Sequence, residues 1–268
     1  MVVSSVIKSI EEVYGKMSVT EGDEHEYVGM VFRYLRNEKA VEFDMRHHLE
    51  EALEMFTGDT GKNVNSPAAI HLFEVNENCE KLNEKDAALF HSTVAKLLFV
   101  SKRARPDIMV AIAFLTTRVS NSDKDDWKKL ERLLSYIRGS IELTLILSAS
   151  STSCVKWWVD ASYGVHPDMR SHTGGSLSLG RGSIYSKSSK QKLNSKSSTE
   201  AELIAASEVL PQILWTRHFL LEQGCQLKES TLFQDNTSAI QMEKNGRASA
   251  GQRSRHINIR YFFLSRTE

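Results

Sequence analysis

The sequence predicts an α/β fold, and the order of elements in its C-terminal half carries that prediction. Strands are expected over residues 155–160, 172–179, 182–192 and 231–234, with a long helix over 199–223 before the last of them. Because a strand that follows a crossover helix can return parallel to an earlier strand, we expect a mixed sheet with helices packed on it. Acidic residues end two of these strands, so carboxylates are expected at the strand ends.

The start of the long helix combines a capping pattern with two acidic residues. Ser197 stands three residues before Glu200, and Thr199 stands three before Glu202, so either pair can form a capping box. At helical spacing Glu202 lies on the apolar face, whereas Glu200 lies on the other side. A carboxylate at a core edge needs a partner. A metal ion is one possibility for Glu202, and a capping acid that bends out to water is the other.

Two further acids follow strands. Asp160 ends the strand over 155–160, and Asp235 ends the strand over 231–234, just before a helix expected over 237–244. Strand ends and a helix start can converge at one edge of a sheet, and hard divalent cations such as Mg²⁺ prefer carboxylate oxygens. Asp160, Glu202 and Asp235 are therefore candidate metal ligands. Paired metals about 3.5–4 Å apart can clamp the attacking and leaving oxygens of a phosphodiester.

Several short segments of this half resemble a known family in their order and spacing. They are Val159-Asp160-Ala161-Ser162, Lys190-Gln191-Lys192, Ser197 to Leu203, Leu214-Trp215, Asp235 to Ala239 and Arg255 to Tyr261. Together they resemble the ribonuclease H region of copia-type retrotransposon polyproteins. The resemblance implies a ribonuclease H-like fold over residues 155–268 and an endonuclease that hydrolyses the RNA strand of RNA–DNA hybrids. It implies that Asp160, Glu202 and Asp235 are catalytic residues and metal ligands that bind Mg²⁺, with Mn²⁺ as a substitute.

The net charge is zero, but the charges are unevenly distributed. Residues 151–268 hold 15 Lys and Arg against 10 Asp and Glu, which leaves 19 against 24 for residues 1–150. No acid occurs between Asp168 and Glu200, and such a basic stretch suits a phosphate backbone, although a lysine-protected edge strand is the alternative. The residues expected to bind nucleic acid are Lys187, Lys190, Lys192 and Lys196, with Asn236, Ser238 and His256 from the family-like segments.

Residues 1–147 predict a separate α+β part. The first expected elements are a helix over 2–14, strands over 26–35 and 40–45 with a turn between them, and a helix over 47–56. Two further helices are expected over 84–103 and 106–119, and a third begins at a cap formed by Ser122 or Asp123 and reaches 138. A strand over 142–147 follows. Three segments (27–30, 103–108 and 133–137) resemble the C-terminal part of copia-type reverse transcriptases. The helices between 84 and 138 then either form a thumb-like element that touches primer–template or simply pack against one another. A small polar linker over 148–154 leads to the ribonuclease H-like part.

The sequence also departs from the family it resembles. The aromatic-X-Asp-Asp turn of reverse transcriptases is not found, since Asp125-Asp126 suits the first turn of a helix. In the family that turn would precede Met1, and the fourth ribonuclease H acid would follow Glu268; Asn258 is not counted as that acid. We therefore expect a truncated ribonuclease H-like sheet that cleaves hybrid poorly, with the palm and fingers of the same polyprotein as partners. A non-catalytic nucleic-acid-binding module and a decayed transposon remnant remain alternatives.

Composition and cysteine spacing narrow the expected compartment and the kinds of partner. The cysteines Cys79, Cys154 and Cys225 are too scattered for a zinc motif or a disulfide framework, which predicts a reducing, intracellular compartment, either a cytoplasmic particle or the nucleus. No apolar run approaches the roughly 20 residues of a membrane helix, and the N-terminus has no secretory cleavage pattern. We therefore expect no membrane partner.

Overall fold

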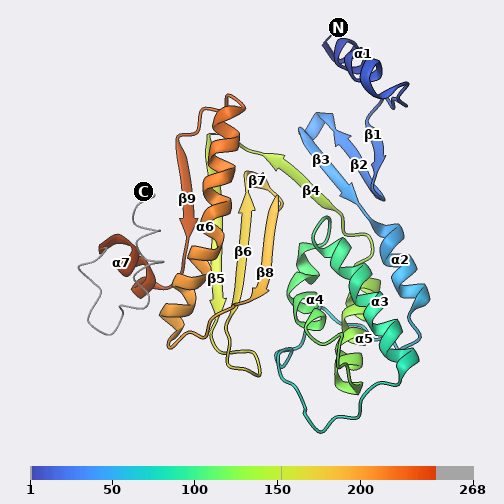
Figure 1. Ribbon diagram of the computed structural model, residues 1–268, viewed down its shortest axis with the longest axis vertical. Coiled ribbons are helices and arrows are strands. Elements are labelled where there is room, and N and C mark those ends of the chain that lie inside the picture. The colour runs from blue at the N-terminus through green and yellow to red at the C-terminus, as the bar shows by residue number, and fades with distance from the viewer. Residues whose placement is uncertain (1, 152, 246–268) are drawn as a thin grey trace.

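The computed structural model describes residues 2–151 and 153–245, and it is a mixed α/β protein with two sheets and flanking helices (Figure 1). One cluster of buried apolar side chains lies between residues 45 and 137, and a second lies between residues 155 and 239. Each half of the chain therefore has a core of its own. None of the helices in this described part combines the length and the apolar character that crossing a bilayer requires.

The strand expected over residues 26–35 is a hairpin in the structure. After helix α1 (Val2–Tyr14), β1 (Glu24–Tyr27) runs antiparallel to β2 (Met30–Leu35). The two residues between these strands, Val28 and Gly29, have φ angles of 52° and 70°. Both lie in the left-handed region, as in the tight two-residue turns of type I′. The single-strand prediction was therefore wrong, because Val28-Gly29 reverses the chain.

Helices α2 to α5 surround the first core and follow the predicted order. The elements after the hairpin are a 3₁₀ turn (Arg36–Glu38), β3 (Ala40–Asp44), α2 (Arg46–Met55), α3 (Glu84–Ser101), a second 3₁₀ turn (Pro106–Ile108), α4 (Met109–Thr116) and α5 (Lys124–Gly139). Asp123, rather than Ser122, begins α5: its carboxylate accepts hydrogen bonds from the backbone N–H groups of Asp125 and Asp126. The acidic run therefore starts a helix, as the sequence predicted.

The second sheet has the predicted mixed topology. Its elements are β5 (Cys154–Ser162), β6 (His172–Ser178), β8 (Tyr185–Lys190), α6 (Ser198–Glu222), β9 (Glu229–Phe233) and α7 (Thr237–Asn245). The strand order is β8-β6-β5-β9, in which β9 is parallel to β5 and the other neighbours are antiparallel. Because β5 and β9 point the same way, the residues that follow them meet at the same edge of the sheet.

Helix α6 covers one face of this sheet (Figure 1). Alternate residues of β5, among them Val155 and Trp157, are buried in the second core with the apolar side of α6, while Trp158 is exposed on the other face. At Gly175 the helix comes so close that an added Cβ atom would lie 3.0 Å from Val209. A larger residue there would push α6 away from β6, so the glycine sets the distance between the helix and the sheet.

Strand β4 (Leu145–Ala149) joins the two halves. It pairs with β3 on one side and with the short β7 (Gly180–Arg181) on the other, which gives the first sheet the order β1-β2-β3-β4-β7. The strand starts later than predicted because the chain first turns after α5, where the Leu143 N–H donates to the Ser140 carbonyl at 3.1 Å. Ser148 and Ala149, expected in the linker, are paired strand residues.

A buried pair of histidines also connects the halves. His166 Nε2 lies 3.0 Å from His172 Nδ1, and His172 Nε2 lies 2.7 Å from Ser188 Oγ. Phe73, from the long loop between α2 and α3, packs its ring against both imidazoles at 4.9 and 5.2 Å between centroids. Burial lowers the pKa of His166 to about 4, helped by the charge of Lys190, and burial also lowers the pKa of His172 to about 4.

Candidate active site

Three carboxylates that lie far apart in the sequence meet at one edge of the second sheet. Asp160 lies near the end of β5, Glu202 lies in the first turns of α6, and Asp235 follows β9. Each offers one oxygen, and the three oxygens lie within 4.8 Å of one another. Glu202 is buried, with 5% of its surface exposed, whereas Asp160 and Asp235 are exposed. The structure thus brings together the three acids that the sequence singled out.

Two hydrogen bonds hold the buried Glu202 in place. Its Oε1 accepts from the backbone N–H of Ala161 at 3.2 Å, and its Oε2 accepts from the side-chain amide of Gln234 at 3.1 Å. The alternative of a capping acid that bends out to water was therefore wrong. Both donors belong to segments that carry the other two acids, so the same bonds fix Glu202 relative to Asp160 and Asp235.

Gln234 is a positioning residue that the sequence argument missed. Besides its bond to Glu202, its Oε1 accepts from the backbone N–H groups of Asp235 at 2.9 Å and Asn236 at 3.2 Å. One side chain therefore shapes the turn after β9 and contacts the central carboxylate. The sequence feature that could have indicated this role is the position of Gln234 directly before Asp235.

The cluster carries negative charge that no described side chain balances. Among the described residues, no Lys, Arg or His forms an ion pair with any of the three acids. Burial raises the pKa of Glu202, the hydrogen bonds from Gln234 and Ala161 oppose that effect, and the charges of Asp160 and Asp235 raise it further. A cation between the carboxylates would relieve this repulsion.

The start of α6 uses one of the two predicted capping pairs. Ser197 Oγ accepts from the Glu200 N–H at 3.2 Å, and the Glu200 carboxylate accepts from the Lys196 N–H at 2.7 Å. Glu200 is buried, with 7% of its surface exposed, where its carboxylate reaches back to the chain before the helix. The pair of Thr199 with Glu202 is not used, which leaves Glu202 to the acidic cluster.

Gln191, from a family-like segment, ties the sheet to the start of α6. Its side-chain amide is fully buried and donates to the Ala201 carbonyl at 2.9 Å and to Thr173 Oγ1 at 3.1 Å. Ala201 directly precedes Glu202. The bond therefore fixes the turn of helix that carries the buried acid, a role that the sequence did not reveal.

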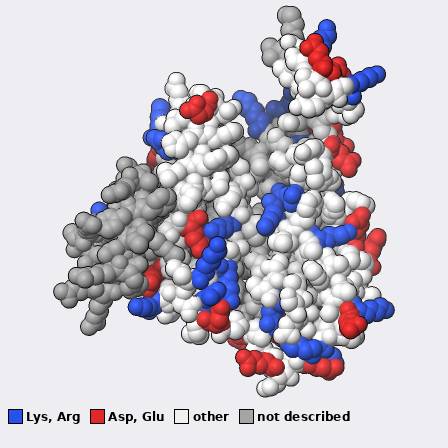
Figure 2. Space-filling view, viewed as in Figure 1, with Lys and Arg blue, Asp and Glu red and all other residues white. Residues whose placement is uncertain are grey.

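The residues predicted to bind nucleic acid fall into two groups. Lys187 pairs with Glu208 at 3.1 Å, and Lys190 pairs with Asp168 at 2.6 Å, so acids from elsewhere in the chain neutralise part of the basic stretch. Lys192 and Lys196 are exposed and form no ion pair within the described part of the chain. Figure 2 shows Lys and Arg side chains interspersed with Asp and Glu side chains on this face of the molecule, not one continuous basic surface.

The remaining predicted residues lie after β9. The Asn236 side chain accepts from the Ala239 N–H at 3.0 Å and so begins α7, and Ser238 is exposed in the first turn of that helix. His256 lies outside the described residues. Asn236 and Ser238 thus lie close to Asp235 along the chain, and binding of nucleic acid by these two residues and by His256 stays a prediction.

The sequence was compared with known proteins. No protein-family model matches it. The chain is 30% identical over 248 residues to the retrovirus-related Pol polyprotein from transposon TNT 1-94 of Nicotiana tabacum, which is 91% of this chain and 18% of that relative. It is 26% identical over 259 residues to the Pol polyprotein from transposon RE2 of Arabidopsis thaliana, which is 96% of this chain and 17% of the relative.

A yeast relative extends the comparison beyond plants. The transposon Ty1-BR Gag-Pol polyprotein of Saccharomyces cerevisiae is 25% identical over 228 residues, which is 81% of this chain and 13% of the relative. The chain spans less than a fifth of the length of each of these three relatives. The resemblance to copia-type polyproteins is confirmed: the chain is homologous, over most of its length, to the Pol polyproteins of copia- and Ty1-type retrotransposons.

Proposed function

We propose that the C-terminal half of this chain is a ribonuclease H-type domain that hydrolyses the RNA strand of RNA–DNA hybrids with the help of Mg²⁺. The observation that carries the proposal is the convergence of Asp160, Glu202 and Asp235 within 4.8 Å at the end of a parallel strand pair. The mixed sheet with α6 on one face and the homology to Pol polyproteins support it.

The donor set fits a hard divalent cation. All three groups are carboxylates, which Mg²⁺ and Mn²⁺ accept as ligands, and the cluster has no cationic partner among the described residues. Bound Mg²⁺ would supply positive charge that activates a water molecule and stabilises the negative charge developing on the phosphate. In this proposal water is the nucleophile, and no covalent bond to the protein forms.

The protein's own part in the reaction is to fix and orient. Ala161 and Gln234 each donate a hydrogen bond to one oxygen of Glu202, so this side chain is held away from solvent. Its carboxylate therefore stays beside those of Asp160 and Asp235. Asp160 and Asp235 are exposed and are open to the substrate side. Their negative charges repel one another, which makes the binding of a cation favourable.

The exposed cations beside this edge are suited to hold the hybrid. Lys196 directly precedes the N-cap of α6, and neither Lys192 nor Lys196 is neutralised within the described residues. Lysine ammonium groups contact phosphates without reading sequence, so binding should weaken with salt. The hydroxyl of Ser238 and the N-terminal N–H groups of α7 add neutral donors close to Asp235.

For residues 1–147 we propose the C-terminal part of a reverse transcriptase, held beside the palm and fingers of the same polyprotein. The apolar sides of α3, α4 and α5 are buried in the first core. Simple packing therefore accounts for the apolar pattern of these helices. Any contact with primer–template must use their polar surfaces.

Metal binding tests the proposed site. We expect MgCl₂ or MnCl₂ to raise the thermal midpoint of the chain, by about 2.7 kcal/mol of stability when the metal is at 100 times its Kd. Asp160→Asn and Asp235→Asn should each lose this rise, while Asp59→Asn, which removes an exposed acid of the first half, should keep it. Equal rises in all four proteins would show that the cluster does not hold metal.

Cleavage of a labelled RNA–DNA hybrid separates the catalytic proposal from its alternative. With Mg²⁺ present, we expect cuts in the RNA strand only, at a low rate, and none in Asp160→Asn or Asp235→Asn. A chain that binds metal and hybrid but leaves the RNA intact would instead be a non-catalytic nucleic-acid-binding module.

A further inference from the structure

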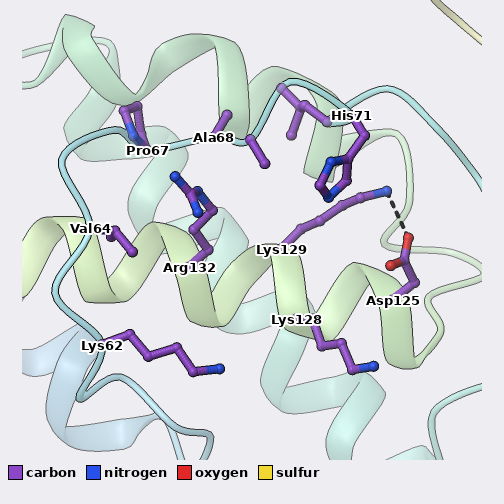
Figure 3. Close-up of a pocket in the computed structure, with 11 residues that line it drawn as sticks. Lys62, Val64, Pro67, Ala68, His71, Asp125, Lys128, Lys129 and Arg132 are labelled. Carbon is purple, nitrogen blue, oxygen red and sulfur yellow. Dashed lines mark ion pairs between the residues drawn. The ribbon is translucent and has the colours of Figure 1, made fainter.

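A basic pocket lies in the N-terminal half, far in sequence from the acidic cluster. It is a cavity of about 250 Å³ between α5 and the loop that joins α2 to α3. Its charged lining is Lys62, Asp125, Lys128, Lys129 and Arg132, and we call this site the α5 pocket. Figure 3 shows Lys129 and Arg132 rising from α5 toward the loop that carries Pro67, Ala68 and His71.

The one acid of the α5 pocket is already engaged. Asp125 pairs with Lys129 at 2.9 Å (Figure 3), and the same ammonium group donates to the Glu74 carbonyl and lies 4.9 Å from the centre of the Phe114 ring. The Lys129 side chain is only 9% exposed, so this pair is part of the packing between α5 and the loop. Three cations are left without a carboxylate inside the pocket: Lys62, Lys128 and Arg132.

These three cations differ in how strongly they are held. Lys62 lies 3.8 Å from Asp59, but both side chains are more than 60% exposed, and such surface pairs contribute little. Lys128 is exposed and forms no ion pair within the described part of the chain. Both ammonium groups can therefore turn toward an anion at little cost.

Arg132 is the strongest indication of a ligand. Its Nη2 donates to Ser66 Oγ at 3.0 Å, it forms no ion pair with a described carboxylate, and its Nε is enclosed without any acceptor. A buried N–H without an acceptor is costly. An oxyanion that entered beside the guanidinium would supply the acceptor that this group lacks, in the fork geometry that arginine offers to phosphate.

The positive charge of the α5 pocket is local. Residues 1–150 as a whole carry 19 Lys and Arg against 24 Asp and Glu, so the surrounding half is acidic. Four cations and one acid around a single cavity therefore run against the average charge of this half. The lysines and the arginine that line the α5 pocket would attract a small anion, whereas the net negative charge of residues 1–150 would not.

Size and lining narrow the ligand. A cavity of about 250 Å³ is at or below the lower end of ordinary small-molecule sites, which span roughly 300–1,000 Å³. The walls are apolar at Val64, Pro67 and Leu72, so the ligand combines a small, partly apolar body with strong negative charge. Three cations with no carboxylate partner inside the pocket exceed the single charge of a carboxylate and match a phosphate with its several acceptor oxygens.

We propose that the α5 pocket binds the phosphate group of one nucleotide unit, with the attached sugar against the apolar wall. The phosphate can come from a free nucleotide or from the backbone of a nucleic-acid strand that crosses α5. This site is separate from the acidic cluster and does not depend on the function proposed for that cluster.

Equilibrium binding tests the α5 pocket in a full-length chain that carries Lys192→Gln and Lys196→Gln, with EDTA present, so that the proposed hybrid site contributes little. The probes are adenosine 5′-monophosphate and a fluorescent single-stranded oligothymidine. Arg132→Gln and Lys128→Gln are each introduced into this chain, and Lys85→Gln, an exposed lysine of α3, is the matched control. Thermal midpoints confirm that the variants are folded, and Lys128→Gln, which alters an exposed side chain, provides the test if Arg132→Gln unfolds.

We expect each pocket variant to bind about tenfold more weakly, as loss of a charge-assisted hydrogen bond implies, and the control to bind as before. Loss for both probes identifies a pocket for free nucleotides, and loss for the oligonucleotide alone, with a shallower salt dependence, identifies a strand phosphate. Both results support the proposal. The proposal would be overturned if the chain bound neither probe, if both pocket variants bound as tightly as the unaltered chain, or if Lys85→Gln weakened binding as much as they do.

Discussion

At the scale of single residues, the candidate active site depends on how one buried carboxylate is held. Glu202 is the least exposed of the three acids, and its two hydrogen bonds come from Ala161 beside Asp160 and from Gln234 beside Asp235. Asp160 and Asp235 are exposed to water, whereas Glu202 must ionise in a partly desolvated place, which is why its pKa is raised. Its position is therefore the most sensitive to its neighbours.

Replacing Gln234 by Ala tests this dependence. The change removes the donor to Glu202 and the acceptor for the Asp235 and Asn236 N–H groups, so we expect the free energy of unfolding to fall by about 1–2 kcal/mol. Mg²⁺ affinity should fall as well, because Glu202 and Asp235, two of the proposed ligands, lose hydrogen bonds that fix their positions. Gln223→Ala, which alters an exposed glutamine at the end of α6, is the control. The positioning role fails if calorimetry gives both variants the wild-type metal affinity.

At the scale of elements, local sequence patterns place the starts of the helices but did not predict the turn between β1 and β2. Asp123 begins α5 and Ser197 begins α6, each through a side chain that accepts from the first turn. The β1–β2 turn is different, because Val28 adopts a positive φ that β-branched residues rarely take. The strands on both sides hold the turn, because all four residues of β1 pair with Met30 to Arg33 of β2.

Val28→Asn should relieve this strain. Asn followed by Gly is the favoured pair for a tight two-residue hairpin turn, and Asn tolerates the left-handed region. We expect the free energy of unfolding to rise by about 0.5–1 kcal/mol in chemical denaturation. Val19→Asn, at an exposed position in the loop before β1, should leave it unchanged. A fall in stability on Val28→Asn would mean that the valine side chain contributes contacts worth more than the strain.

At the scale of the whole molecule, the two cores are joined by β4 and by the aromatic contact at the histidine pair. Phe73 of the first half packs on His166 and His172 of the second, and α4 packs against β8. Both imidazoles are buried and have a pKa of about 4, below the ordinary value of 6.5. The folded chain therefore keeps them neutral where the unfolded chain would bind protons.

The sign of the pH dependence follows from these lowered pKa values. Above pH 6.5 the imidazoles are neutral in both the folded and the unfolded chain, so they do not lower the free energy of unfolding. Between pH 6.5 and about 4 the unfolded chain binds more protons, so stability should fall by up to about 1.4 kcal/mol per pH unit for each histidine. Urea unfolding across this range should show a shallower fall in His172→Gln than in wild type. His91→Gln, at an exposed position, should keep the wild-type slope, and equal slopes in all three would exclude the interface as the cause.

Some of the fold could be predicted because it is encoded locally. The apolar spacing and the caps of α3, α5 and α6 placed these helices to within about two residues at each end, since a helix depends on side chains three and four positions apart. The parallel return of β9 beside β5 followed from the crossover helix between them. Two acids at strand ends and one at a helix start then indicated the three carboxylates from the sequence.

Contacts between distant segments were decided only by the tertiary structure. The Lys190–Asp168 and Lys187–Glu208 pairs, the Gln234 bond to Glu202 and the Phe73 contact with the histidines join residues from different elements. No period or spacing encodes such contacts, because each depends on how strands and helices pack after they form. The sequence by itself therefore determined which acids could form a site. Packing of α6 on β5 and β6, with β9 paired to β5, determined that the three acids meet, that Glu202 is the buried one, and that no described cationic side chain balances their charge.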